Sequence, residues 1–194
     1  MSLDLVIVYG STRSARQGIK LARFLVRQVE ARGHQAHLID PLEVRLPLLD
    51  RMYKEYPKGA APEVLEQMAG RLRNADGFLI VRGEYNHGIP PALKNLLDHF
   101  LEEWFWRPSA IACYSAGAFG GVRAAMQLRA TLAELGMPSI PSLYPVPKVG
   151  QQFDDDGTPV DDGPARRVRR FLTEFEWYAG ALRAARAGGV PYYR

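Results

Sequence analysis

Short apolar runs recur along this chain at intervals that suit buried strands. The five runs occupy residues 4–9, 36–39, 76–81, 109–114 and 139–144. Apolar runs of this length, bounded by Gly or Pro, are typical of strands buried on both faces of a parallel sheet. The pattern therefore predicts five strands, the last of them interrupted by Pro141.

Between these runs, apolar residues recur at the spacing of helices. The helical patterns cover residues 19–29, 62–72, 90–100, 122–135 and 168–182. Gly33 and Gly136 close two of them, and prolines stand at the start of two others, where a helix loses no hydrogen bond. Alternating strands and helices predict an α/β protein with helices on both faces of a parallel sheet.

Two segments follow neither pattern. Residues 41–61 mix charges, Tyr, Met and Pro, and residues 151–164 contain five aspartates, so we expect both to be surface loops. No internal repeat is visible. We expect one domain over residues 1–194, with 188–194 as a loose tail or an oligomer contact.

Composition narrows the class of protein. Hydrophobic residues make up 47% and charged residues 24%, which favours a globular fold over disorder. The net charge of +4 suits anionic small molecules and is too diffuse to indicate nucleic acid. The densest basic run, residues 166–170, is interpreted as a solvated helix face. No stretch approaches the roughly 18 apolar residues of a membrane span. With one cysteine and a first strand in place of a signal peptide, we expect a cytoplasmic protein.

Three unusual loops leave the carboxyl ends of predicted strands, where open parallel sheets bind ligands. The first, residues 10–18, is GSTRSARQG. It joins a strand to a helix N-terminus, which attracts phosphate, and Ser11, Thr12, Ser14, Arg13 and Arg16 add donors. It is neither a Walker A sequence nor GxGxxG, so a phosphomonoester is favoured over a dinucleotide or triphosphate. An ordinary connection with two surface arginines is the alternative.

The other two loops are suited to a flat ligand. Residues 83–88, GEYNHG, place glycines around the ring of Tyr85 and the amide of Asn86. Residues 115–121, SAGAFGG, form a loop of small residues that can present backbone N–H groups. Each loop is also compatible with a plain turn.

Other chemistries fit less well. The four histidines form no HExxH pair, so a zinc hydrolase is not expected, and we assign no metal site. His99 with Glu102 and Glu103 is interpreted as a polar helix end. Ser115 lacks the frame of a nucleophile elbow, and Cys113 lies in an apolar strand as an inert thiol.

At these loops the chain resembles the NADPH-dependent FMN reductase family, which includes quinone, chromate and azo-dye reductases. GSTRSARQG, EYNHGIPPALKNLLDH and SAGAFGGVRAAMQLR carry the resemblance, in the family's order, across roughly residues 4–145. One departure is Gly83, where the family usually has proline. The resemblance implies a flavodoxin-like three-layer fold with strand order 2-1-3-4-5.

The resemblance also implies a binding site for FMN. The implied site residues are Ser11, Arg13, Ser14, Arg16, Gln17 and Gly18 at the phosphate, Glu84, Tyr85, Asn86 and His87 along the ring and ribityl chain, and Ser115, Ala116, Gly117, Gly120 and Gly121 at the pyrimidine side. Family members are commonly homodimers or homotetramers, and the helix with Lys94, Asn95 and Asp98 often serves an interface.

The implied activity is transfer of hydride from NADPH or NADH to bound FMN. The electrons then pass, in ping-pong fashion, to a small acceptor: a quinone, free flavin, azo dye or metal oxyanion. The flavin carries the chemistry, so no catalytic side chain is assigned. The alternatives are an electron carrier of the flavodoxin type, which the basic charge disfavours, and a protein that keeps the fold without the cofactor.

Overall fold

The computed structural model describes residues 2–191 and contains a five-stranded parallel sheet. The strands are β1 (Asp4–Tyr9), β2 (Gln35–Ile39), β3 (Gly77–Gly83), β4 (Ser109–Tyr114) and β5 (Ser139–Val146). Their order is β2-β1-β3-β4-β5, and every neighbouring pair is parallel. The predicted strand order is therefore confirmed.

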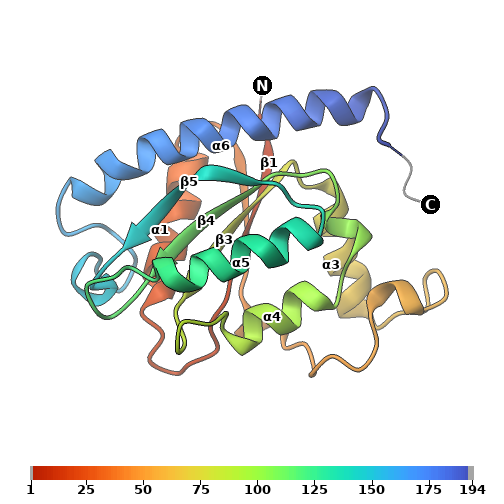
Figure 1. The fold of residues 1–194 in the computed structure, drawn as a ribbon, viewed down its shortest axis with the longest axis horizontal. Coiled ribbons are helices and arrows are strands. Elements are labelled where there is room, and N and C mark those ends of the chain that lie inside the picture. The colour runs from red at the N-terminus through yellow and green to blue at the C-terminus, as the bar shows by residue number, and fades with distance from the viewer. Residues whose placement is uncertain (1, 192–194) are drawn as a thin grey trace.

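Helices cover both faces of this sheet (Figure 1). The helices are α1 (Gly18–Glu30), α2 (Pro41–Val44), α3 (Glu63–Asn74), α4 (Pro91–Asp98), α5 (Val122–Glu134) and α6 (Gly163–Ala187), with short 3-10 turns at Tyr53–Glu55, Glu102–Trp104 and Val149–Gln151. Because side chains alternate along a strand, Leu5 and Ile7 pack with α1 and α6, whereas Val6 and Val8 pack with α3, α4 and α5. The result is a helix–sheet–helix sandwich with two apolar cores.

Three element boundaries differ from the sequence-based expectation. β3 continues through Arg82 and Gly83, beyond the end of the expected strand at residue 81. β5 continues past Pro141 to Val146, with a register shift against β4 where an interruption was expected. α6 begins at Gly163 and not at the expected residue 168. Pro164 fits in its first turn, because a proline there needs no N–H partner.

The surface segments match their predicted character. Within 41–61 the only regular elements are α2 and the turn Tyr53–Glu55, and Asp40 caps α2 by accepting a hydrogen bond from Leu42 N at 3.0 Å. The arginines of the basic run are exposed on α6: Arg166, Arg167, Arg169 and Arg170. Of the predicted tail, residues 192–194 lie outside the described part of the chain. No helix within residues 2–191 is long and apolar enough to cross a membrane.

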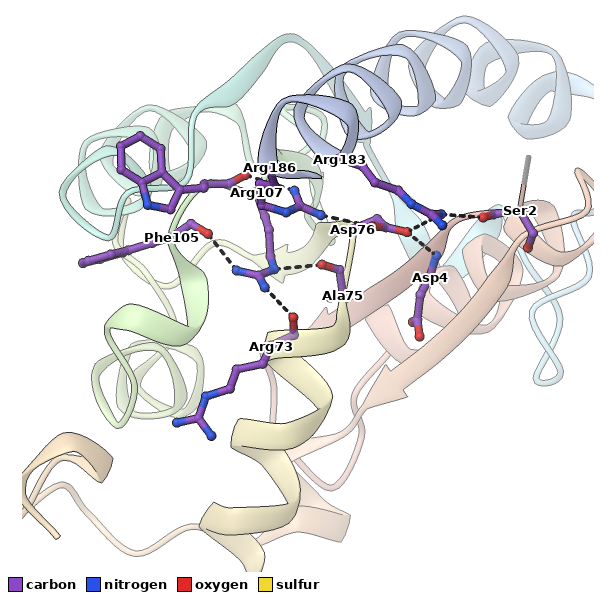
Figure 2. A network of polar contacts seen from close by, with 10 residues as sticks. Ser2, Asp4, Arg73, Ala75, Asp76, Phe105, Arg107, Arg183 and Arg186 are labelled. Carbon is purple, nitrogen blue, oxygen red and sulfur yellow. Dashed lines mark hydrogen bonds and ion pairs between the residues drawn. The ribbon is translucent and has the colours of Figure 1, made fainter. Parts of the chain in front are cut away.

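At the amino-terminal edge of the sheet, Asp76 connects α6 to two strands (Figure 2). Its carboxylate accepts hydrogen bonds from Asp4 N, Arg183 Nη1 and Arg186 Nη2, each at 3.0 Å. Asp76 is buried, and Arg183 also donates to Ser2 O at 2.8 Å. One carboxylate thus connects the start of β1, the start of β3 and the end of α6.

A third arginine, Arg107, completes this edge (Figure 2). Arg107 donates to Ala75 O at 2.8 Å, to Phe105 O at 2.7 Å and to Arg73 O. Burial, together with the nearby Arg186 guanidinium, lowers the pKa of Arg107 to about 10, so it remains charged at neutral pH. The bonds to Arg73 O and Ala75 O satisfy carbonyl groups at the end of α3.

Candidate functional site

A cleft of about 450 Å³ opens at the carboxyl edge of the sheet, opposite the Asp76 network. Loops that follow β1, β3, β4 and β5 line it. The lining residues are Ser11, Arg13, Ala15, Arg16, Gln17, Gly83, Glu84, Tyr85, Tyr114, Ser115, Ala116, Lys148, Val149, Gly150 and Gln151. The volume falls in the range of roughly 300–1,000 Å³ that small-molecule sites occupy.

The first loop brings an open helix N-terminus to the cleft. Gln17 is the N-cap of α1, and no side chain of the described residues caps the helix there. Lys20 N donates to Gln17 O at 3.2 Å, so the N–H groups before it, at the very start of α1, are the ones available to an anion. Arg13 lines the cleft beside them.

Arg16 lines the same cleft, but its charge is already engaged. It forms an ion pair with buried Asp40, and its guanidinium lies 5.4 Å from the centre of the Tyr9 ring. The hydrogen bond to Asp40 raises the pKa of Arg16. Since Asp40 also caps α2, this pair connects the loop after β1 to the loop after β2.

The second loop is a tight turn between Tyr85 and Gly88. Asn86 and His87 have φ of 49° and 64°, and the backbone of Tyr85 bonds Gly88 in both directions, at 3.3 and 2.8 Å. These features define a type I′ turn. Tyr85 lines the cleft, and its hydroxyl lies 2.9 Å from Ser11 Oγ. Asn86 and His87, at the tip, are exposed outside the cleft.

Glu84 connects the second loop to α5. Its Oε2 accepts a hydrogen bond from Ala124 N at 3.3 Å, and its Oε1 lies 3.7 Å from Arg123 Nη1. The carboxylate thereby satisfies an N–H group in the first turn of α5. Glu84 supports the wall as well as lining it.

The third loop is bonded to the loop after β5. Ser115 Oγ donates to Gly117 O and accepts from Gly120 N, both at 2.9 Å. Lys148 N donates to Gly117 O at 2.9 Å, and Val149 N donates to Ser115 O at 3.1 Å. These backbone bonds place Lys148 in the cleft wall.

Tyr114 forms part of the cleft wall and is seated by glycines. A Cβ atom on Gly18 would lie 2.0 Å from Tyr114 Cζ, and one on Gly83 would lie 3.1 Å from Tyr114 Cε2. A Cβ on Gly121 would lie 2.7 Å from Tyr114 O. Burial raises the pKa of Tyr114, whose hydroxyl donates to Tyr9 Oη at 3.4 Å. Gly18 and Gly121 thus make room for Tyr114 and do not line the cleft themselves.

The structure brings together about half of the residues that the sequence indicated. Those in the cleft wall are Ser11, Arg13, Arg16, Gln17, Glu84, Tyr85, Ser115 and Ala116. Those outside it are Ser14, Gly18, Asn86, His87, Gly117, Gly120 and Gly121. Sequence reasoning missed Ala15, Tyr114 and residues 148–151. The position of 148–151 after a fifth parallel strand was the signal that could have found them.

Cys113, His99 and Glu103, to which the sequence analysis gave no role in binding, lie outside the cleft. Cys113 is buried, and burial raises its pKa to about 11, as expected of an inert thiol. His99 is the C-cap of α4, as expected of a polar helix end, although it and Glu103 are buried. His99 Nδ1 lies 2.7 Å from Asn95 O, and Glu103 accepts from Arg73 at 2.7 Å. Within residues 2–191, no group of His, Cys, Asp and Glu is arranged to hold a metal.

Several known proteins are similar to this chain in sequence or in fold. The NADPH-dependent FMN reductase family model matches residues 3–151. A quinone reductase of Pseudomonas putida is 28% identical over 180 residues, covering 89% of this chain and 90% of that protein. A quinone reductase of Escherichia coli is 31% identical over 137 residues, covering 69% and 71%. The structure of FerB, a flavoenzyme NAD(P)H:(acceptor) oxidoreductase from Paracoccus denitrificans, superposes with a TM-score of 0.73 at 23% identity, covering 92% and 98%.

Proposed function

The chain belongs to the NADPH-dependent FMN reductase family, and from this membership we propose that the cleft described above is its FMN site. The protein is an NAD(P)H-dependent FMN oxidoreductase that acts on quinone or flavin acceptors. The observation that carries the site assignment is the convergence of an uncapped α1 N-terminus, Arg13 and Tyr85 on one cleft. We propose that residues 1–194 form one FMN-binding domain.

The chemistry of the donors fits FMN. The phosphate belongs at the first turn of α1, where N–H groups are open and Arg13 and Gln17 line the cleft. The isoalloxazine belongs against the wall formed by Gly83, Tyr85 and Ala116, where small residues admit a flat ring. Predicted residues outside the cleft act by shaping these loops, as Gly18 and Gly121 do for Tyr114.

When bound, FMN supplies the redox chemistry, taking electrons from NAD(P)H and giving them to the acceptor. The protein binds and orients both partners at one open cleft, so we propose that nicotinamide and acceptor use it in turn. No proton donor is required of the side chains. Azo dyes and metal oxyanions are further acceptors that such an open site would admit.

The proposal is tested by adding FMN to the purified protein, removing the excess and recording the visible spectrum. We expect bound flavin that bleaches rapidly with anaerobic NADPH or NADH and recovers on addition of a quinone. Bound flavin that resists both donors would instead favour an electron carrier. Absence of bound flavin would overturn the assignment of the cleft.

Arg13→Gln should weaken FMN binding about tenfold and leave riboflavin binding unchanged. A charged hydrogen bond contributes roughly 1.5–3 kcal/mol, and exposure at the cleft rim places Arg13 at the low end of that range. Flavin fluorescence titration measures both affinities. Arg23→Gln, on the exposed face of α1, which follows the loop of Arg13, is the control and should change neither. An equal loss for both flavins would contradict a role at the phosphate.

The natural partner is proposed to be a small-molecule acceptor and not nucleic acid, because the net charge of +4 is low and the densest basic run, residues 166–170, lies on the exposed face of a helix. We also propose a cytoplasmic homodimer or homotetramer. Exposed leucines support the assembly: Leu48, in particular, is 85% exposed beside a groove formed with α4.

A further inference from the structure

Arg82 is a fully buried arginine that has no acidic partner. It is the penultimate residue of β3 and lies opposite Cys113 in β4. Its side chain has no solvent exposure. All of its hydrogen bonds go to backbone carbonyl groups, and it forms no ion pair with a carboxylate anywhere in residues 2–191. Buried arginines are ordinarily paired.

The guanidinium lies directly behind the cleft wall. Arg82 Nε donates to Gly83 O at 2.7 Å, Nη2 donates to the same oxygen, and Nη1 donates to Gly121 O at 3.4 Å. Gly83 lines the cleft, and Gly121 is the N-cap of α5, whose helix dipole adds positive potential at that point. The positive charge is therefore adjacent to the cleft and is buried out of contact with water.

None of the titratable groups around Arg82 forms an ion pair with it within residues 2–191. Those that act on it are Cys113, Glu84 and Tyr114. Burial raises the pKa values of Cys113 and Tyr114, so both are neutral at pH 7. The Glu84 carboxylate is directed to Ala124 N and Arg123. A neutral side chain of similar volume would avoid the cost of burying a charge.

We propose that Arg82 is an electrostatic positioning residue that favours the reduced form of FMN bound in the cleft. Two electrons taken up with one proton, the equivalent of a hydride, leave the flavin ring with one additional negative charge. A buried cation stabilises that charge more than water does, because the local dielectric constant is low. The inference rests on the proposed function and concerns the same site.

The direct test is the midpoint potential of bound FMN in the wild type and in Arg82→Met. Loss of the cation should weaken binding of reduced FMN about tenfold relative to oxidised FMN. That ratio corresponds to a potential lower by about 30 mV for a two-electron couple. A potential unchanged in Arg82→Met would overturn the inference.

Two further variants separate charge from structure. Arg82→Lys keeps the charge and should keep the potential near that of the wild type, whereas an equal fall in Arg82→Lys and Arg82→Met would overturn the inference. Arg129→Met is the matched control, because Arg129 also donates to two carbonyl groups, those of Ile140 and Pro141, but neither of these residues lines the cleft. It should leave the potential unchanged.

The wild type provides a readout that does not depend on a variant folding. If the added charge is retained, the potential should fall by about 30 mV per pH unit between pH 6 and 8, since one proton accompanies two electrons. A slope of about 60 mV, from two protons, would overturn the inference. If FMN does not bind at all, the proposed function fails, which is a distinguishable result.

Discussion

Asp76→Ala should lower the free energy of unfolding by about 3 kcal/mol. Removing one partner of a buried ionic network costs roughly 3–5 kcal/mol, because the remaining charges stay desolvated and unpaired. The low end applies because Arg183 is 41% exposed and can return to water, whereas Arg186 is only 18% exposed. At 2–4 °C per kcal/mol for a chain of this size, the melting temperature should fall by about 6–12 °C. Urea and thermal unfolding followed by circular dichroism measure both.

Two comparisons identify the cause of that loss. Asp155→Ala removes a surface ion pair with Lys20, formed by a carboxylate that is 98% exposed, and should have no measurable effect. Asp76→Ala combined with Arg186→Met should recover part of the stability, because the double variant leaves one fewer unpaired charge. A single variant Asp76→Ala as stable as Asp155→Ala would contradict the importance of this network.

Gly18→Ala should weaken FMN binding about 10- to 100-fold. The new Cβ would lie 2.0 Å from Tyr114 Cζ, so either the ring must move within the cleft wall or the start of α1 must shift. Overpacking of this kind costs roughly 1–3 kcal/mol, and each 1.4 kcal/mol is tenfold in affinity. Fluorescence titration with FMN measures the affinity, and unfolding measures any accompanying loss of stability.

Gly70→Ala is the matched control for this steric effect. Gly70 lies in the interior of α3, and a Cβ there would meet no atom within 4 Å. The substitution should increase stability by about 0.5–1 kcal/mol, since alanine is the better helix former, and leave FMN affinity unchanged. FMN affinity in Gly18→Ala equal to that in Gly70→Ala would contradict the role of Gly18 in seating Tyr114.

Local patterns were sufficient to predict the fold. Apolar runs and helical spacing predicted all five strands and the main helices, because each element buries its own side chains against the sheet. Boundaries were wrong where a residue acts against its usual preference. The apolar run ends before Arg82, but this charged residue is buried in β3, and Pro141 lies in β5 where the ladder shifts register.

The site could be predicted only as far as single loops reveal it. Arg16 appeared to be a free phosphate ligand, but its partner Asp40 is 24 residues away, and nothing local indicates that pairing. Lys148 was missed because prolines at 145 and 147 hid the end of β5. Pairings between distant segments depend on the assembled sheet, so single-sequence patterns do not contain them.

The hydrogen bond from Arg183 to Ser2 has a practical consequence for attaching the protein to a surface. It holds the beginning of the chain beside the last turns of α6, at the edge of the sheet that faces away from the cleft. A terminus at the surface, away from the binding site, suits fusion and attachment. A protein tethered to an electrode through its N-terminal residues would therefore present its cleft to the solution, with the immobilising chemistry on the opposite side.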